Sequence, residues 1–356
     1  MQSDPERIDT RVVRSRIKEG ISVSKIIMSL NCIYRFVLLL IVPATVIAAD
    51  PVTEMGEFSV FGKVGLDELA QSGVKTATGA PMSTPRYLST QTCFIIPKPP
   101  DQVLAAMKRF DPTAHRELKV YLNSELSGSP SAASFAKLNN PPQNSAVQAL
   151  SAATKAMSQD LQISRAEAQK YSAGQPVFAF WTDLLAKRAQ DFAAGGASRQ
   201  APYDHSKNPV QPGQELNGLM KQQPKVNRQF GGFLGATGLL GGKGSLQADN
   251  YWQLLEVEDV GVVTLGASYT RTTPGGGAQL ADGFYYASGG YNVALTLYQL
   301  WPVNTGGQPS TLVWRGDFIS ANTLGTLHGI ERLASEGAMR KDISKAATIF
   351  LRENSR

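Results

Sequence analysis

The chain contains 356 residues, with 35 Lys and Arg against 29 Asp and Glu, and carries a formal net charge of +6. Residues 1–49 hold seven of the basic and four of the acidic residues, so the remainder has a net charge of only +3. Proteins that bind nucleic acid concentrate Lys and Arg in one run or on one face. No such run follows Asp50, and the composition therefore argues against a nucleic-acid partner.

Only Cys93 follows residue 49, which excludes a disulfide within residues 50–356. Small domains with weak cores often depend on disulfides, so residues 50–356 must be stabilised by burial instead. Cys93 lies in the apolar, β-rich run Thr92–Ile96. We expect it to be a small buried side chain rather than a reactive thiol.

An uncharged apolar run extends from Phe36 to Ala49, preceded by Arg35 and followed by Asp50. A secretory signal peptide consists of a positively charged residue or region, a short apolar stretch and small residues at the cleavage site. A membrane-spanning helix needs about 20 apolar residues, whereas this run is shorter and is interrupted by Pro43. We therefore expect cleavage after Ala48 or Ala49, a periplasmic or extracellular location, and no stable transmembrane anchor after processing.

Residues 50–89 are punctuated by Gly, Pro, Ser and Thr and predict an irregular segment with one strand at 57–64. The continuous apolar run 90–97 then predicts a buried strand. A helix follows from Asp101, with apolar residues at helical spacing as far as Phe110, and 116–124 alternates like a strand. Residues 143–160 and 176–195 predict helices, and between them Ser164–Glu167 has the form of a capping box. Residues 90–196 thus read as a strand–helix–strand unit followed by helices.

Residues 197–249 differ in composition from the rest. Residues 198–228 are rich in Gln, Asn and Pro and predict an exposed polar insert. Residues 230–246 are apolar but rich in glycine, which costs about 1 kcal/mol per residue in a helix relative to alanine. Apolar side chains at this density are not left in water. We expect this block to be a mobile cover that either docks on the domain's own sheet or awaits a ligand, a membrane or another protein.

Residues 250–356 predict an antiparallel β region and a C-terminal helix. The expected strands are 251–258, 260–270, 284–288, 291–301 and 311–320, with a hairpin at Ser288–Gly290. A helix or a broken pair of helices over 322–353 follows, with 335–337 as the expected position of the break. The expected fold is α+β, with an antiparallel sheet packed by helices and a long C-terminal helix, and residues 90–356 forming one domain. A helix-grip arrangement, in which a curved sheet surrounds that helix beside a cavity, is a specific version of it.

Sequence motifs for nucleotides and for nucleophilic serine are incomplete. A Walker loop needs Gly, four residues and then Gly-Lys-Ser or Gly-Lys-Thr, but Gly242-Lys243 is followed by Gly244 and Thr237 replaces the first glycine. The nearest match to a Gly-x-Ser-x-Gly elbow is Gly266–Thr270, which lacks the second glycine. We expect no cofactor.

Histidine is scarce, and His115, His205 and His328 are the only three. His328 and Glu331 could share one face of a helix and contact a metal ion, but a closed site needs about four ligands. We expect no metal, and surface hydrogen bonding as the role of all three histidines.

Four carboxylates, Asp249, Glu256, Asp282 and Asp317, lie on or beside the predicted strands. Two carboxylates at a working separation could perform acid–base chemistry on a sugar, but the sequence alone brings no two together. Arg315 and Asp317 alternate with aliphatic residues, which indicates either a buried charged site or, more simply, an exposed sheet face. The catalytic residues are thus unknown at this stage.

The last third of the chain is rich in aromatic residues. Most of them are explained by β propensity and core packing, but a concave sheet lined with Tyr and Trp is also a common way to build a ligand pocket. The candidate ligand-binding residues are Tyr286, Tyr298, Trp301 and Trp314.

These observations favour a non-catalytic binding protein of the cell envelope or the extracellular space, with an apolar or amphipathic small molecule as its ligand. Two alternatives remain. One is a structural or assembly partner of an envelope protein, suggested by the polar insert and the Gly-rich block. The other is a hydrolase with an unrecognised acid–base site, suggested by the carboxylates.

The signal peptide gives the first testable prediction. N-terminal sequencing of the native protein should find Ala49 or Asp50 at the mature N-terminus. A protein that retains Met1 or Met28 would contradict it.

Overall fold

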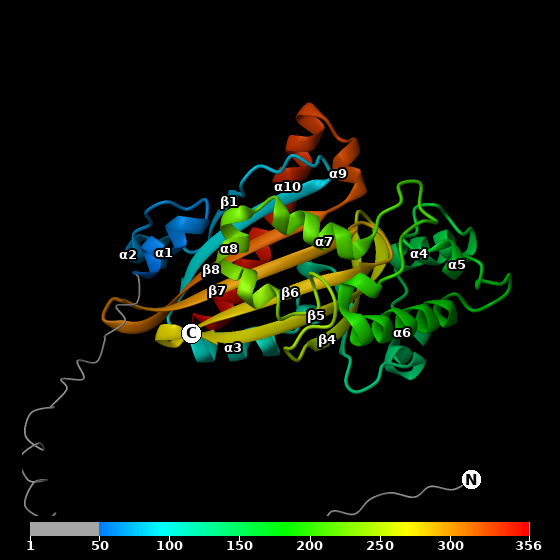
Figure 1. Cartoon of the computed structure of the whole chain (residues 1–356), viewed down its shortest axis with the longest axis horizontal. Coiled ribbons are helices and arrows are strands. Elements are labelled where there is room, and N and C mark those ends of the chain that lie inside the picture. Colours follow the sequence, from blue (N-terminus) through cyan, green and yellow to red (C-terminus); the bar gives the residue numbers. More distant parts are fainter. Residues whose placement is uncertain (1–49, 356) are drawn as a thin grey trace, which may run out of the picture. The chain divides into compact units, whose positions relative to one another are not determined.

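One antiparallel sheet of eight strands organises the computed structural model, which describes residues 50–355 (Figure 1). The predicted signal peptide therefore lies outside the described residues. The strand order is β1-β2-β8-β7-β6-β5-β4-β3. The strands are β1 Lys75–Thr78, β2 Tyr87–Ile96, β3 Val120–Glu125, β4 Asp249–Val257, β5 Val260–Thr273, β6 Gly277–Ala287, β7 Val293–Thr305 and β8 Gln308–Ser320.

Ten α-helices accompany the sheet within the described residues: α1 Pro51–Phe58, α2 Leu66–Ser72, α3 Pro100–Arg109, α4 Ser145–Lys155, α5 Arg165–Ala168, α6 Val177–Gly195, α7 Pro212–Lys221, α8 Pro224–Leu234, α9 Asn322–Thr326 and α10 Gly329–Asn354. Short 3₁₀ turns lie at Pro112–Ala114, Arg116–Leu118, Ala132–Asn139, Gly196–Arg199 and Pro274–Gly276. The expected α+β class, with its antiparallel sheet and long C-terminal helix, is confirmed. None of the described helices combines the length and the apolarity needed to cross a bilayer.

The two faces of the sheet are covered by different helices (Figure 1). Helices α1, α4, α6, α7 and α8 cover one face and form the main core with alternate strand residues such as Leu295, Leu297 and Trp314. Helix α3 and the C-terminal part of α10 pack on the opposite face, against Phe94, Val313 and their neighbours. Because successive strand residues point to opposite faces, both faces are built from the same strands.

The early strand–helix–strand pattern is confirmed as β2, α3 and β3, and the capping box at Ser164 and Glu167 is present at the start of α5. Cys93 is fully buried in β2, and burial raises the pKa of its thiol to about 12. It is therefore an unreactive core side chain, as expected.

Two predicted local structures are wrong. Residues 57–64 do not form a strand: α1 extends over 51–58, and 59–64 has no regular secondary structure. The helix begins there because the Asp50 side chain caps the Thr53 amide and Pro51 occupies the first turn. The C-terminal segment does form two helices, α9 and α10, but the break between them lies at 327–328. The break predicted at 335–337 is absent, since α10 runs unbroken through Gly337. A single glycine costs a helix only about 1 kcal/mol, which the rest of this long helix can offset.

Residues 198–228 are not an exposed insert. They contain α7, whose Leu216, Leu219 and Met220 are buried against the sheet. The polar neighbours are also used internally: Glu215 pairs with Arg86 at 2.7 Å and Gln223 donates to the Ala80 carbonyl. The polar composition hid an apolar stripe at helical spacing.

The Gly-rich block docks on the domain's own sheet, the first of the two outcomes considered. Phe230, Phe233 and Leu234 form the end of α8, and together with Leu239 they are fully buried in the main core. The start of the block is helical despite its glycines, because burying large apolar side chains outweighs a propensity cost of about 1 kcal/mol per glycine.

Gly196 lets the Gly-rich loop approach the end of α6. Its φ is +65° with ψ −164°, and a Cβ there would lie 2.5–2.6 Å from the carbonyl oxygens of Gly238, Gly241 and Gly242. The Ala197 and Ser198 amides then donate to Gly238 and Gly241 at 2.8 and 3.0 Å. Only glycine meets both the backbone conformation and the close contact.

We therefore expect Gly196→Ala to lower the free energy of unfolding. Backbone strain alone costs about 1–3 kcal/mol, and the steric clash should make the loss larger. Gly276→Ala is the matched control, because Gly276 also has a positive φ, of +81°, but nothing lies within 4 Å of its Cβ position. Urea unfolding measures both variants. Equal losses would contradict the assigned steric role of Gly196.

Candidate functional site

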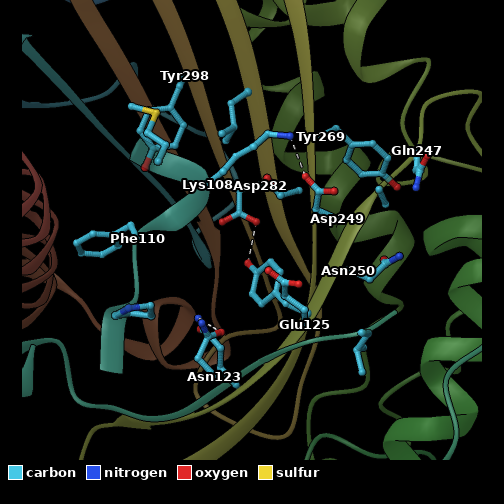
Figure 2. A pocket seen from close by; sticks show the side chains of 18 of the residues that line it. Lys108, Phe110, Asn123, Glu125, Gln247, Asp249, Asn250, Tyr269, Asp282 and Tyr298 are labelled. Carbon is cyan, nitrogen blue, oxygen red and sulfur yellow. Dashed lines mark hydrogen bonds and ion pairs between the residues drawn. The ribbon is translucent and has the colours of Figure 1, made fainter. Parts of the chain in front are cut away.

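A cavity of about 1100 Å³ lies on the face of the sheet that carries α3 and α10 (Figure 2). The sheet forms its floor and the two helices form a wall. The lining residues used below are Phe94, Tyr251, Ser268, Leu280, Asp282, Tyr298 and Arg315 from the strands, Met107, Lys108 and Phe110 from α3 and its end, and Ala346, Ala347 and Phe350 from α10.

Strand register lines up a row of polar residues across this floor. Asp249 on β4 lies opposite Ser268 on β5, and Ser268 opposite Asp282 on β6. Asp282 in turn lies opposite Thr296 on β7, and Thr296 opposite Asp317 on β8. Paired residues of neighbouring strands point to the same face, so five strands bring these polar groups together.

Arg315 and Asp317 form a buried ion pair in this floor. Arg315 Nε and Nη2 donate to the two carboxylate oxygens at 2.8 and 2.7 Å, and Thr296 also donates to Asp317 at 3.0 Å. The side chains are 16% and 5% exposed. Burial alone would lower the pKa of Arg315, but the Asp317 carboxylate outweighs burial and raises it. The exposed-face interpretation of this pair is therefore wrong.

Tyr251 reaches Asp282 across an intervening strand. Its hydroxyl donates to Asp282 Oδ1 at 2.7 Å (Figure 2), although Tyr251 is on β4 and Asp282 on β6. Gly266 on β5 permits this, because a Cβ there would lie 2.3 Å from Tyr251 Cζ. The absence of a side chain at Gly266 thus positions the tyrosine ring over β5.

Asp282 has an altered acidity. Burial raises the pKa of its carboxyl to about 6, although the Tyr251 hydrogen bond and the nearby Arg315 charge favour the ionised form. In turn, burial and the Asp282 charge raise the pKa of Tyr251 well above its usual value. Within the described part of the chain, Asp282 Oδ2 has neither a hydrogen-bond donor nor a cationic partner. Asp282 is therefore largely ionised at neutral pH but is protonated in mild acid.

The rim of the cavity is more exposed. Lys108 and Asp249 form an ion pair there at 3.1 Å (Figure 2), with side chains 45% and 63% exposed. Pairs of this kind contribute about 0–1 kcal/mol. Phe110 stacks on His115, which contacts Glu353 at 3.1 Å and so ties the end of α3 to α10.

Of the four predicted ligand-binding aromatics, the structure places only Tyr298 in the cavity. Tyr286 is buried beside Arg188, Trp301 donates to Glu54 and Trp314 donates to Gln91, all on the main-core side. Side-chain parity explains the separation: Tyr298 and Trp301 are three residues apart on one strand and point to opposite faces. Ligand binding by these residues stays a prediction, but for three of them the cavity gives it no support.

The four carboxylates are also divided. Asp249 and Asp282 line the cavity and Asp317 lies in its floor, whereas Glu256 bonds to Lys119 and Tyr121 elsewhere. The sequence interpretation missed Tyr251 and Lys108. A signal for Tyr251 existed, because it alternates with the buried Trp252 and Leu254.

The histidines lie outside this cavity. His205 contacts the Met157 carbonyl at 3.1 Å, and His328 is an exposed residue at the start of α10. No group of three His, Cys, Asp or Glu side chains within residues 50–355 is placed to hold a metal ion.

The acidity of Asp282 predicts how stability depends on pH. Between the ordinary pKa of 3.8 and the folded-state value of about 6, the folded protein holds a proton that the unfolded chain has released. Stability therefore falls as the pH rises through this window. At about 1.4 kcal/mol per pKa unit the cost reaches on the order of 3 kcal/mol above pH 6.

We expect Asp282→Asn to be more stable than the wild type by about 2–3 kcal/mol at pH 8, and nearly equal to it at pH 4. Urea unfolding at both pH values measures the difference. Asp317→Asn is the control, and it should destabilise the protein at both, because it leaves Arg315 buried without a partner. An Asp282→Asn variant less stable than the wild type at pH 8 would contradict the analysis.

Comparison with known proteins adds no assignment to this geometry. No protein-family model matches the sequence, and no curated protein or solved structure shows significant similarity to it.

Proposed function

We propose that this chain is an exported binding protein that holds one small amphipathic molecule in the cavity between the sheet and helices α3 and α10. Export is inferred from the apolar run at 36–49 and the small residues that end it. The ligand class is inferred from the cavity.

The observation that carries the proposal is the contrast between wall and floor. Met107, Phe110 and Phe350 present apolar surface from the two helices, while Asp282 and Arg315 present charge from the strands. Small-molecule sites are largely apolar clefts of about 300–1000 Å³ with a few placed polar groups. A cavity of about 1100 Å³ built in this way fits a molecule with an apolar body and one polar head.

Hydrolysis is a second candidate, favoured by one observation. The pKa of Asp282, about 6, suits proton transfer near neutral pH. Paired-carboxylate chemistry needs a second carboxyl group with its own role. Asp317 is held by Arg315 and Thr296, Asp249 pairs with Lys108, and Glu125 is exposed at the end of β3. We therefore rank binding above hydrolysis.

A role as an assembly partner has lost the features that suggested it. The apolar residues of both segments are packed into the core: Leu216, Leu219 and Met220 of α7, and Phe230, Phe233, Leu234 and Leu239 of the Gly-rich block. What remains in its favour is a pair of exposed apolar side chains on α10, Ile330 and Leu333, which are 84% and 68% exposed. Two side chains are too small a patch to outrank the cavity.

The uncharged probe N-phenyl-1-naphthylamine tests the proposal, because its fluorescence increases in apolar surroundings. We expect saturable binding by the purified protein. Ala346→Trp places bulk in the cavity from α10 and should weaken binding at least tenfold, since the probe and the indole compete for one volume.

Thr348→Trp is the matched control, because Thr348 lies on the exposed side of the same helix. It should bind the probe like the wild type. Binding that is not saturable, or that is equal in the two tryptophan variants, would overturn the proposal.

A further inference from the structure

We propose that the ligand carries a protonated amine as its head group, and that this amine forms an ion pair with Asp282 in the cavity floor. The inference rests on the proposed function and names the chemical class that the same cavity selects.

The first argument is the pairing of interior carboxylates. Glu167, Glu215 and Asp317 are buried, and each forms an ion pair with an arginine: Arg188, Arg86 and Arg315 respectively. Asp282 is half-buried, lines the cavity and receives only the Tyr251 hydroxyl among the described residues. An interior carboxylate without a cation is costly. A cationic group on the ligand would supply the positive charge that an arginine supplies to the other three carboxylates.

The second argument is geometry. Tyr251 occupies Asp282 Oδ1 and leaves Oδ2 for a donor in the cavity. Asp282 is central in the row of polar residues, with Ser268 and Thr296 as its direct neighbours on either side. An ammonium group has three donors, so it could bond the carboxylate and still reach a hydroxyl. The tyrosine rings of the floor add a further favourable surface for a cation.

The third argument is charge balance. The floor holds two carboxylates, Asp282 and Asp317, and one guanidinium, Arg315, which already donates to Asp317 and lies 5.6 Å from the Tyr298 ring centroid. An amine neutralises the remaining negative charge. An anionic head group that contacted Arg315 would instead be repelled by the ionised carboxylate of Asp282.

Charged and titratable groups from several elements surround Asp282 in this cavity. They are Tyr251 and Asp249 from β4, Tyr269 from β5, Tyr298 from β7, Arg315 and Asp317 from β8, Lys108 from α3, Glu125 from β3 and Lys243 from the Gly-rich loop. Figure 2 shows Lys108, Glu125, Asp249, Tyr269 and Tyr298 around Asp282. Helix α10 contributes Ala346, Ala347 and Phe350, none of which titrates. Among these groups Asp282 is the one whose pKa is raised to about 6. Protonation of Asp282 in mild acid should therefore weaken the binding of an amine.

Three amphiphiles with one alkyl chain and different heads test the inference: decylamine, decanol and decyl sulfate. The charge of each head stays constant between pH 5 and pH 8, so a change of affinity with pH comes from the protein. In displacement of N-phenyl-1-naphthylamine at pH 7.5, decylamine should show at least tenfold higher affinity than decanol, and decyl sulfate should show the lowest affinity. The preference for the amine should fall severalfold at pH 5.

Asp282→Asn should weaken decylamine binding at least tenfold and leave decanol binding within about twofold. Asp342→Asn, on the exposed side of α10, makes the same change in net charge and should leave all three affinities unchanged. Thermal melting of both variants establishes that they are folded.

The outcomes separate the two proposals. If none of the three amphiphiles displaces the probe, the proposed function itself fails. If they bind with equal affinity, or if Asp282→Asn does not affect decylamine, the cavity binds amphiphiles but the amine assignment is overturned. Tightest binding of decyl sulfate, especially at pH 5, would instead assign the head group to Arg315 and a protonated Asp282.

Discussion

The pairing of β2 with β8 is the constraint on which the rest of this structure depends. Ten consecutive residue pairs join Tyr87–Ile96 to Thr311–Ser320, so a strand from the first third of the chain enters the sheet beside the last strand. Helix α3 follows β2 after a short proline-rich turn and is thereby carried onto the face that exposes Arg315 and Asp282. Without this long-range pairing the polar row of the floor would have no wall opposite it.

Buried charge is distributed unevenly over the two faces. On the main-core side Arg188 is almost fully buried and donates to both oxygens of Glu167. Such a pair is costly to break but contributes little compared with apolar packing. On the cavity side Asp282 has no cationic partner among the described residues, and burial raises the pKa of its carboxyl. Proteins retain destabilising groups of this kind where binding or catalysis requires them, and Asp282 lines the cavity between the sheet and helices α3 and α10.

Glycine is used on both faces for close approach rather than for mobility. Gly266 allows the Tyr251 ring to lie over β5 and reach Asp282. Gly196 allows the Gly-rich loop to pack against the end of α6, where Tyr269 also contacts the Gly238 amide. The sequence shows that these glycines are present but does not indicate that they allow a close approach. Their role depends on which backbone or ring lies opposite, and that is decided by pairing far along the chain.

The sequence alone determined the α+β class, the strand at 90–97 and the capping box at Ser164. These follow from periodicity and capping, which act over a few residues. Side-chain alternation along β7 also places Tyr298 and Trp301 on opposite faces, although both were candidate ligand-binding residues.

Only the tertiary structure decided which face borders the cavity, because that depends on which helices cover each side. It also decided that the polar stretch 198–228 holds a core helix, that α10 runs unbroken, and that Arg315 and Asp317 are buried. The contact between Tyr251 and Asp282 joins residues 31 positions apart through a gap at a third, Gly266. No local pattern encodes such a contact, since strand register and long-range packing create it.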